Sequence, residues 1–156
     1  MLTTIETVLQ SNKLYQFWLF GNITDVIYNW KNKLPDYISR RIVILGSQPN
    51  EVLSKYYKRS KIVLCPSLYE STHIVSAEGL CNGCSIVTTP NPTLSCIHWY
   101  VSAQSGTISE IDTPNSFANA ILSEINAWEL GKRDPQFISK IWCDRLLATS
   151  SIKSFL

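Results

Sequence analysis

Short, continuous apolar runs alternate with helical segments along most of this chain. The runs cover residues 14–20, 41–45, 61–65 and 85–88, and a Gly or Pro follows within two residues of each. Unbroken apolar character is typical of strands that are covered on both faces, whereas half-exposed strands alternate apolar with polar residues. The pattern therefore predicts an α/β fold with a parallel sheet and helices on both of its faces.

The segments between these runs have the apolar spacing of amphipathic helices. In residues 23–34 this spacing puts Val26, Ile27, Trp30 and Leu34 on one face. Thr113 followed by Pro114 is a helix start signal, and Asp134-Pro135 repeats it before a final helix that is unusually apolar for a terminal one. We expect that final helix to pack on a further domain. Between residues 91 and 111 the pattern is weak, with a short helix or turn suggested at residues 99–101 and a small edge strand at residues 106–108.

Length and composition limit the class of protein. A chain of 156 residues is long enough for one α/β domain and too short for two, so we expect a single domain over residues 1–156. No apolar run is long enough to cross a bilayer, and the N-terminus lacks the pattern of a signal peptide, which predicts a cytoplasmic protein. The net charge of +2 is too small to indicate nucleic acid as a partner. The basic cluster around Lys58 is either a solvated helix end or a patch for phosphate or membrane.

The five cysteines leave one unpaired in any full disulfide scheme. Cys65 and Cys84 fall in or beside apolar runs, where buried reduced thiols are common. Cys81 and Cys84 have the spacing of a redox or zinc pair, but they follow a helix, whereas a thioredoxin-type pair precedes one. A zinc site would need two more ligands, and only Cys96 and His98 are plausible.

Two carboxylates frame a predicted helix start in the segment from Cys65 to Cys84. Glu70 follows the strand-like run, and Glu78 lies within the helix, which we expect to begin near residue 72 or 73. Free N–H groups in the first turn of a helix attract anions, and carboxylates accept hydrogen bonds from diols. The segment therefore suits a ligand that carries both phosphate and hydroxyl groups. Alternatively, Glu70 is an ordinary loop carboxylate and Glu78 faces solvent.

The same residues resemble a known family. The run KIVLCPSLYESTHIVSAEGLCNGCSIVTT is similar to the signature segment of the group 1 or family 4 retaining glycosyltransferases. In that segment a strand ends in Pro-Ser, a pair of glutamates with seven residues between them follows, and a helix leads through a Gly to another strand. The upstream residues 41–46 and 53–57 and the downstream residues 106–108 also match, so the resemblance covers roughly residues 1–130.

This resemblance implies a fold and a ligand. Such enzymes pair two Rossmann-like domains in the type B fold, and this chain resembles the C-terminal one, which binds a nucleoside-diphosphate sugar. It implies that Glu70 acts near the transferred sugar and that Glu78 holds the ribose. The other donor-binding residues that it implies are Ser71, Thr72, His73, Ile74, Val75, Gly21 and Gly46. No metal or other cofactor is expected.

Two departures from the family pattern affect these expectations. His73 stands where the family commonly has a Gly, so it is either a polar contact to the donor or a residue that only starts the helix. The Gly-Arg and Lys-Gly segment that neutralises the diphosphate has no counterpart, and we expect the acceptor-binding N-terminal domain to be absent. The chain is then expected to be inactive alone and to need that domain in cis or in trans, with any membrane association through the missing half. A non-catalytic Rossmann-like interaction or regulatory module is the alternative.

Overall fold

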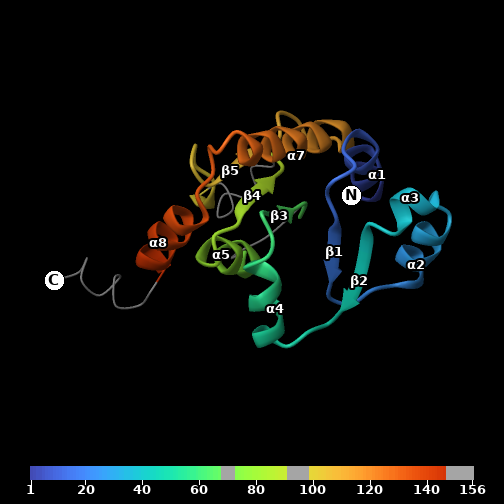
Figure 1. Cartoon of the computed structure of the whole chain (residues 1–156), viewed down its shortest axis with the longest axis horizontal. Helices are drawn as coiled ribbons and strands as arrows, with labels where there is room; N and C mark the ends of the chain where they lie inside the picture. The colour runs from blue at the N-terminus through green and yellow to red at the C-terminus, as the bar shows by residue number, and fades with distance from the viewer. Residues whose placement is uncertain (68–72, 91–98, 147–156) are drawn as a thin grey trace. The chain divides into compact units, whose positions relative to one another are not determined.

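The computed structural model describes residues 1–67, 73–90 and 99–146 (Figure 1). The chain divides into two compact units, Met1–Leu53 and Ser54–Leu156. The described strands pair in parallel within each unit, as a β1-β2 sheet and a β3-β4-β5 sheet. This mixed architecture confirms the predicted α/β class, with its strands in two sheets.

The first unit packs short helices against a parallel strand pair. Strand β1 runs beside β2 with Phe17 opposite Ile42, and apolar residues of α1, α3 and β2 form the core. Its elements are α1 (Leu2–Ser11), β1 (Phe17–Phe20), α2 (Asp25–Asn32), α3 (Asp36–Ser39) and β2 (Ile42–Gly46).

Buried Arg41 anchors α1 to the start of β2. Its guanidinium donates to the backbone oxygens of Leu9 and Asn12 at the end of α1, at 2.5 Å each, and its Nε donates to the oxygen of Tyr37 at 2.9 Å. The last carbonyls of a helix have no partner within the helix, and a cation is stabilised there by the helix dipole. Arg41 therefore satisfies the C-terminus of α1 without a Gly cap.

Two sequence predictions for this unit were too long. The strand expected over residues 14–20 begins only at Phe17, because the amide of Leu14 donates to the side chain of Asn12 in a local turn and Leu14 is 84% exposed. The helix expected over residues 23–34 is the shorter α2. None of its residues is fully buried, and Val26 is 66% exposed. Trp30 does pack against the core, with its ring N–H bonded to Glu6.

In the second unit, helices cover both faces of the β3-β4-β5 sheet (Figure 1). The parallel register puts Val63 beside Ile86, and both belong to a core shared with α5 and α8. On the other face, Ser85 of β4 and Thr107 of β5 bond to α7. The remaining elements are α4 (Asn50–Tyr57), which joins the units, β3 (Ile62–Cys65), α5 (Ile74–Cys81), β4 (Ser85–Thr88), β5 (Gly106–Ile108), α7 (Pro114–Glu129) and α8 (Pro135–Leu146).

The predicted starts of the last two helices are confirmed. Thr113 accepts a bond from the amide of Ser116 at 3.3 Å, with Pro114 in the first turn of α7. The carboxylate of Asp134 accepts the amides of Gln136 and Phe137 at the start of α8. The apolar character of α8 has an explanation inside the chain, because its Ile138 and Trp142 are buried in the core beside α5.

A buried ion pair holds α7 to the segment before α8. Glu124 is fully buried. Its carboxylate accepts hydrogen bonds from two nitrogens of Arg133, at 2.5 and 2.8 Å, and from the hydroxyl of Thr107 at 2.6 Å. Burial opposes ionisation of this carboxyl. Hydrogen bonds from Arg133, Ser85 and Thr107, and the charge of Arg133, outweigh it and hold the pKa of Glu124 below its ordinary value. A buried charge is tolerated when its partners are this complete.

We predict that Glu124→Gln destabilises the protein by about 3–5 kcal/mol at neutral pH, because it leaves the Arg133 charge buried without a counter-ion. A lowered carboxyl pKa contributes stability above the unfolded-state value of about 4.3, and that contribution is lost as the pH falls through the folded-state pKa. The difference in unfolding free energy between wild type and Glu124→Gln, measured in urea, should therefore narrow below about pH 4. A gap that stays constant down to pH 2 would contradict this account.

Gly83 makes the turn from α5 into β4 in a space with no room for a side chain. Its φ is +87°, and a Cβ there would lie 2.6 Å from the backbone oxygen of Pro135 at the start of α8. Gly131 has a φ of +68° but nothing within 4 Å of its Cβ position. The two glycines therefore share the left-handed backbone and differ in crowding.

We predict that Gly83→Ala lowers stability more than Gly131→Ala does. Both variants carry the cost of about 1–2 kcal/mol for a left-handed non-glycine residue, and only the first also displaces Pro135. Chemical unfolding of the two variants side by side measures the difference. Equal destabilisation would show that Pro135 at the start of α8 moves away from the added methyl group at little cost.

Candidate functional site at the start of α5

The side chain of His73 caps α5. Its Nδ1 accepts the amide N–H of Ser76 at 3.1 Å and lies 2.8 Å from the Ser76 hydroxyl. The residue is 7% exposed. Capping satisfies one of the amides that a helix start leaves without an intrahelical partner. Of the two roles considered for His73, the structure gives it the role of starting the helix, and a contact to a ligand stays a prediction.

Strand β3 and helix α5 meet through Ser76. Its hydroxyl lies 3.0 Å from the thiol of Cys65, the last residue of β3, while its amide is held by His73. This bond places the start of α5 at the carboxyl end of β3. In open parallel sheets that edge is where ligands bind, with helix N-termini directed at them.

Ile74 and Val75 form the first turn of α5 and are exposed. The two residues are 63% and 44% exposed. The first four amides of a helix lack intrahelical partners, and His73 occupies only that of Ser76. The amides of Ile74 and Val75 therefore lie where an anion would meet the helix start.

Glu78 is half-buried one turn into α5 and accepts a hydrogen bond from Tyr57 at the end of α4. The distance between the Tyr57 hydroxyl and Glu78 Oε2 is 3.1 Å. Burial raises the pKa of the Tyr57 phenol well above its ordinary value, and the negative charge of Glu78 raises it further. Tyr57 therefore stays protonated at neutral pH and orients the carboxylate as a donor. This pairing argues against Glu78 as an unengaged solvent-facing residue.

Gly21 and Gly46 lie together at the carboxyl ends of β1 and β2. The amide of Gly21 donates to the oxygen of Gly46 at 3.0 Å, and the two have φ values of +98° and +67°. No heavy atom lies within 4 Å of a Cβ built at either position. Both glycines thus end their strands as predicted, with open space beside them, and their contact with a ligand stays a prediction.

Three predicted site residues, Glu70, Ser71 and Thr72, lie outside the described residues, so the separation of the two glutamates is not part of the site geometry.

The two cysteines Cys81 and Cys84 have different partners. Cys84 is buried, and its thiol donates to the backbone oxygens of Tyr57 and Ser60, while the backbone oxygen of Cys81 accepts the thiol of Cys143. Within residues 1–67, 73–90 and 99–146, no group of three His, Cys, Asp or Glu side chains is arranged to hold a metal.

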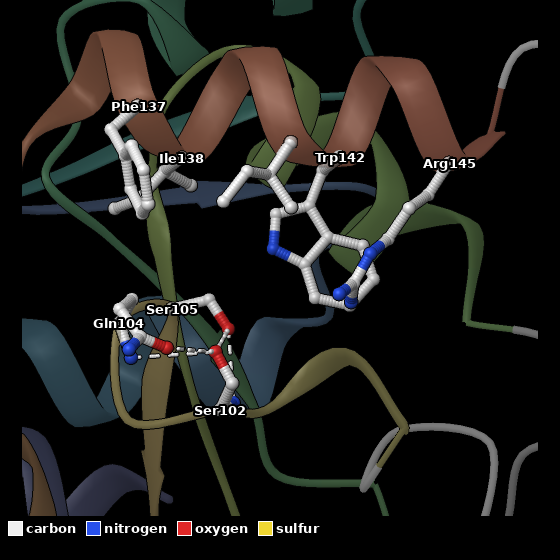
Figure 2. A pocket seen from close by; sticks show the side chains of 8 residues that line it. Ser102, Gln104, Ser105, Phe137, Ile138, Trp142 and Arg145 are labelled. Atoms are coloured by element: carbon white, nitrogen blue, oxygen red, sulfur yellow. Dashed lines mark hydrogen bonds between the residues drawn. The ribbon is translucent and has the colours of Figure 1, made fainter.

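A shallow pocket lies elsewhere in the second unit, between α8 and the turn before β5 (Figure 2). It has a volume of about 80 Å³ and contains none of the predicted site residues. Figure 2 shows Phe137, Trp142 and Arg145 extending from α8 toward Ser102, Gln104 and Ser105. The hydroxyl of Ser102 is bonded to both Gln104 and Ser105, so the polar side of the pocket is already occupied by internal contacts.

Sequence reasoning missed two residues that shape the site. Tyr57 was placed on a helix, but nothing in the sequence pairs it with Glu78, which lies 21 positions away. Ser76 lies inside the predicted helix with no local signal for its role, and its link to Cys65 spans 11 positions. Both contacts depend on how α4, β3 and α5 pack.

The parallel strands, the helices that cover them and the helix start at the end of β3 define a Rossmann-like α/β domain. A family model described as glycosyl transferases group 1 matches residues 1–126. The chain therefore belongs to the group 1 glycosyl transferases. No match was found among curated proteins.

Two solved structures have a similar fold. The crystal structure of TarM superposes with a TM-score of 0.75 at 16% identity, over 99% of this chain and 30% of that one. The α,α-trehalose 6-phosphate synthase from Burkholderia multivorans gives 0.68 at 11% identity, over 99% and 38%. This chain thus spans about a third of the length of these structures. None of its described helices combines the length and hydropathy of a membrane span.

We predict that His73→Ala destabilises the protein by about 0.5–2 kcal/mol through loss of the α5 cap. His73→Asn should recover most of that loss, because Asn is among the preferred capping residues. Urea unfolding at neutral pH measures both variants. If Asn were as destabilising as Ala, the imidazole would act through packing and not through its bond to Ser76.

Proposed function

We propose that this chain is the domain of a retaining glycosyltransferase that binds a nucleoside-diphosphate sugar. The observation that carries the proposal is the orientation of Glu78 by Tyr57, one turn from a helix start at the carboxyl end of β3. Membership of the group 1 glycosyl transferases supports the reaction class.

Glu78 is assigned to the ribose. One carboxylate oxygen accepts from Tyr57, and an ionised carboxylate has acceptor capacity left for a pair of vicinal hydroxyls. Charge-assisted hydrogen bonds of this kind are shorter and stronger than neutral ones. The bond to Tyr57 already restricts the Glu78 side chain. Less conformational entropy is therefore lost when the ligand binds, which favours affinity.

The diphosphate is assigned to the start of α5. The amides of Ile74 and Val75 are available there, and the helix dipole adds partial positive charge. The loop residues Ser71 and Thr72 and the carboxylate of Glu70 complete the proposal on the side of the transferred sugar, with Glu70 in the catalytic role. His73 acts by holding the helix start in place, and Gly21 and Gly46 leave room for nucleotide groups.

Transfer of the sugar requires more than this domain. The leaving nucleoside diphosphate develops negative charge, which needs positive neighbours in the transition state. In the proposal these neighbours and the acceptor site belong to an N-terminal domain that works with this one in cis or in trans in the cytoplasm. The transferred group is a hexosyl unit, no metal takes part, and this domain alone binds donor without turnover.

Titration calorimetry with uridine diphosphate and guanosine diphosphate tests donor binding. We expect one of the two to bind, and Glu78→Gln to weaken it about tenfold or more, the equivalent of at least about 1.4 kcal/mol. Asp144→Asn, an exposed carboxylate on α8, serves as the control and should bind as wild type does. Thermal melts should be similar for all three proteins.

Absence of binding at millimolar nucleotide by a folded sample would contradict the proposal and favour a non-catalytic interaction module. Unchanged affinity in Glu78→Gln would remove the assignment of the ribose to this residue.

A further inference from the structure

The end of α5 and the middle of α8 are joined by a cluster of small polar side chains. The thiol of Cys143 donates to the backbone oxygen of Cys81 at 3.6 Å, and the hydroxyl of Ser139, one turn earlier, donates to the same oxygen at 2.5 Å. Cys81 is the last residue of α5. The face of α8 that carries Ser139 and Cys143 therefore lies directly against that helix end.

The two cysteines therefore touch through the Cys143 thiol and the backbone of Cys81. Burial raises the pKa of Cys81 to about 12, and a side-chain hydrogen bond with Cys143 contributes to the shift. Both cysteines are half-buried, whereas Cys65 and Cys84 are fully buried. Small oxidants can reach thiols that are partly exposed, and buried structural cysteines are inert.

We propose that Cys81 and Cys143 form a redox-sensitive pair that closes into a disulfide between α5 and α8. A disulfide requires Cα atoms within about 7 Å and converging Cβ vectors. Helices α5 and α8 pack directly against each other, and the Cys143 thiol lies 3.6 Å from the backbone oxygen of Cys81. The Cys-x-x-Cys motif of Cys81 and Cys84 does not compete, because the Cys84 thiol is engaged with Tyr57 and Ser60 on the side of α4.

The reaction is a thiol–disulfide exchange with a small disulfide such as oxidised glutathione. In the first step the Cys143 thiol gives its proton to water, its sulfur attacks one glutathione sulfur, and the other glutathione leaves as a thiolate. Cys81 then gives its proton to that thiolate or to water, and its sulfur attacks Cys143, which expels the second glutathione. The two cysteines lose two electrons and two protons, and one disulfide is reduced to two thiols.

Closure has a structural consequence that does not depend on the ligand. The bond joins residues 62 positions apart, and cross-links over long loops reduce the entropy of the unfolded chain. It also fixes the C-terminal end of the helix that carries Glu78, three residues before Cys81. Oxidation should therefore raise the thermal midpoint by several degrees.

The test incubates the whole chain in glutathione buffers of increasing oxidised fraction at neutral pH. Free thiols are then blocked with N-ethylmaleimide, and the protein is digested and analysed by mass spectrometry without reduction. We expect a linked peptide containing Cys81 and Cys143, with Cys65 and Cys84 blocked only after unfolding. The oxidised protein should melt above the reduced protein.

Two serine variants control this experiment. Cys143→Ser should show no linked peptide and no change of midpoint on oxidation, while Cys84→Ser should still form the link. The proposal is overturned if both cysteines remain free at every ratio, if Cys143 stops at a glutathione adduct, or if Cys81 links to Cys84 or Cys96. A lower midpoint after closure would also overturn it, because it would show that the bond strains the helix pair.

Discussion

The close approach of α5 to β3 is the contact on which the candidate site depends. Gly79 allows it, because a Cβ at that position would lie 2.7 Å from a methyl group of Val63. With the helix this near the strand, Ser76 reaches Cys65 and His73 caps the helix at the carboxyl end of β3. This one helix carries the first-turn amides of Ile74 and Val75 and the Glu78 carboxylate, and His73 caps it. A larger residue at position 79 would move them together.

The two faces of the β3-β4-β5 sheet are stabilised by different means. The face toward α5 and α8 is largely apolar, with Trp142 edge-to-face against Trp99 and tilted against Tyr100. The face toward α7 contains the buried ion pair of Glu124 and Arg133, which is satisfied by Thr107 and Ser85. A buried ion pair is stable only in good geometry, so the charged face fixes the register of α7. Close packing at Gly79 fixes the helix that carries the site.

Much of the second unit was predictable because its local signals agree with its packing. The strands at 62–65, 85–88 and 106–108 and the Thr113-Pro114 helix start appear where the pattern puts them. The first unit was less predictable. Leu14 is apolar, but a bond to Asn12 places it in a turn, and the short helix α3 at Asp36–Ser39 follows Pro35 with little periodicity to reveal it. Patterns of burial are informative for elements inside a core and weak for short elements at its surface.

The sequence by itself determined the α/β class, the family resemblance and the position of Glu78 on a helix that begins beside a strand end. These follow from hydrophobic periodicity, capping residues and a motif within a short stretch of chain. Only the tertiary structure decided that Tyr57 holds Glu78, that His73 turns inward to cap α5, and that the Cys143 thiol lies against the backbone of Cys81. Such contacts join residues from separate elements, and their partners are set by how closely the helices and strands pack, which no local pattern encodes.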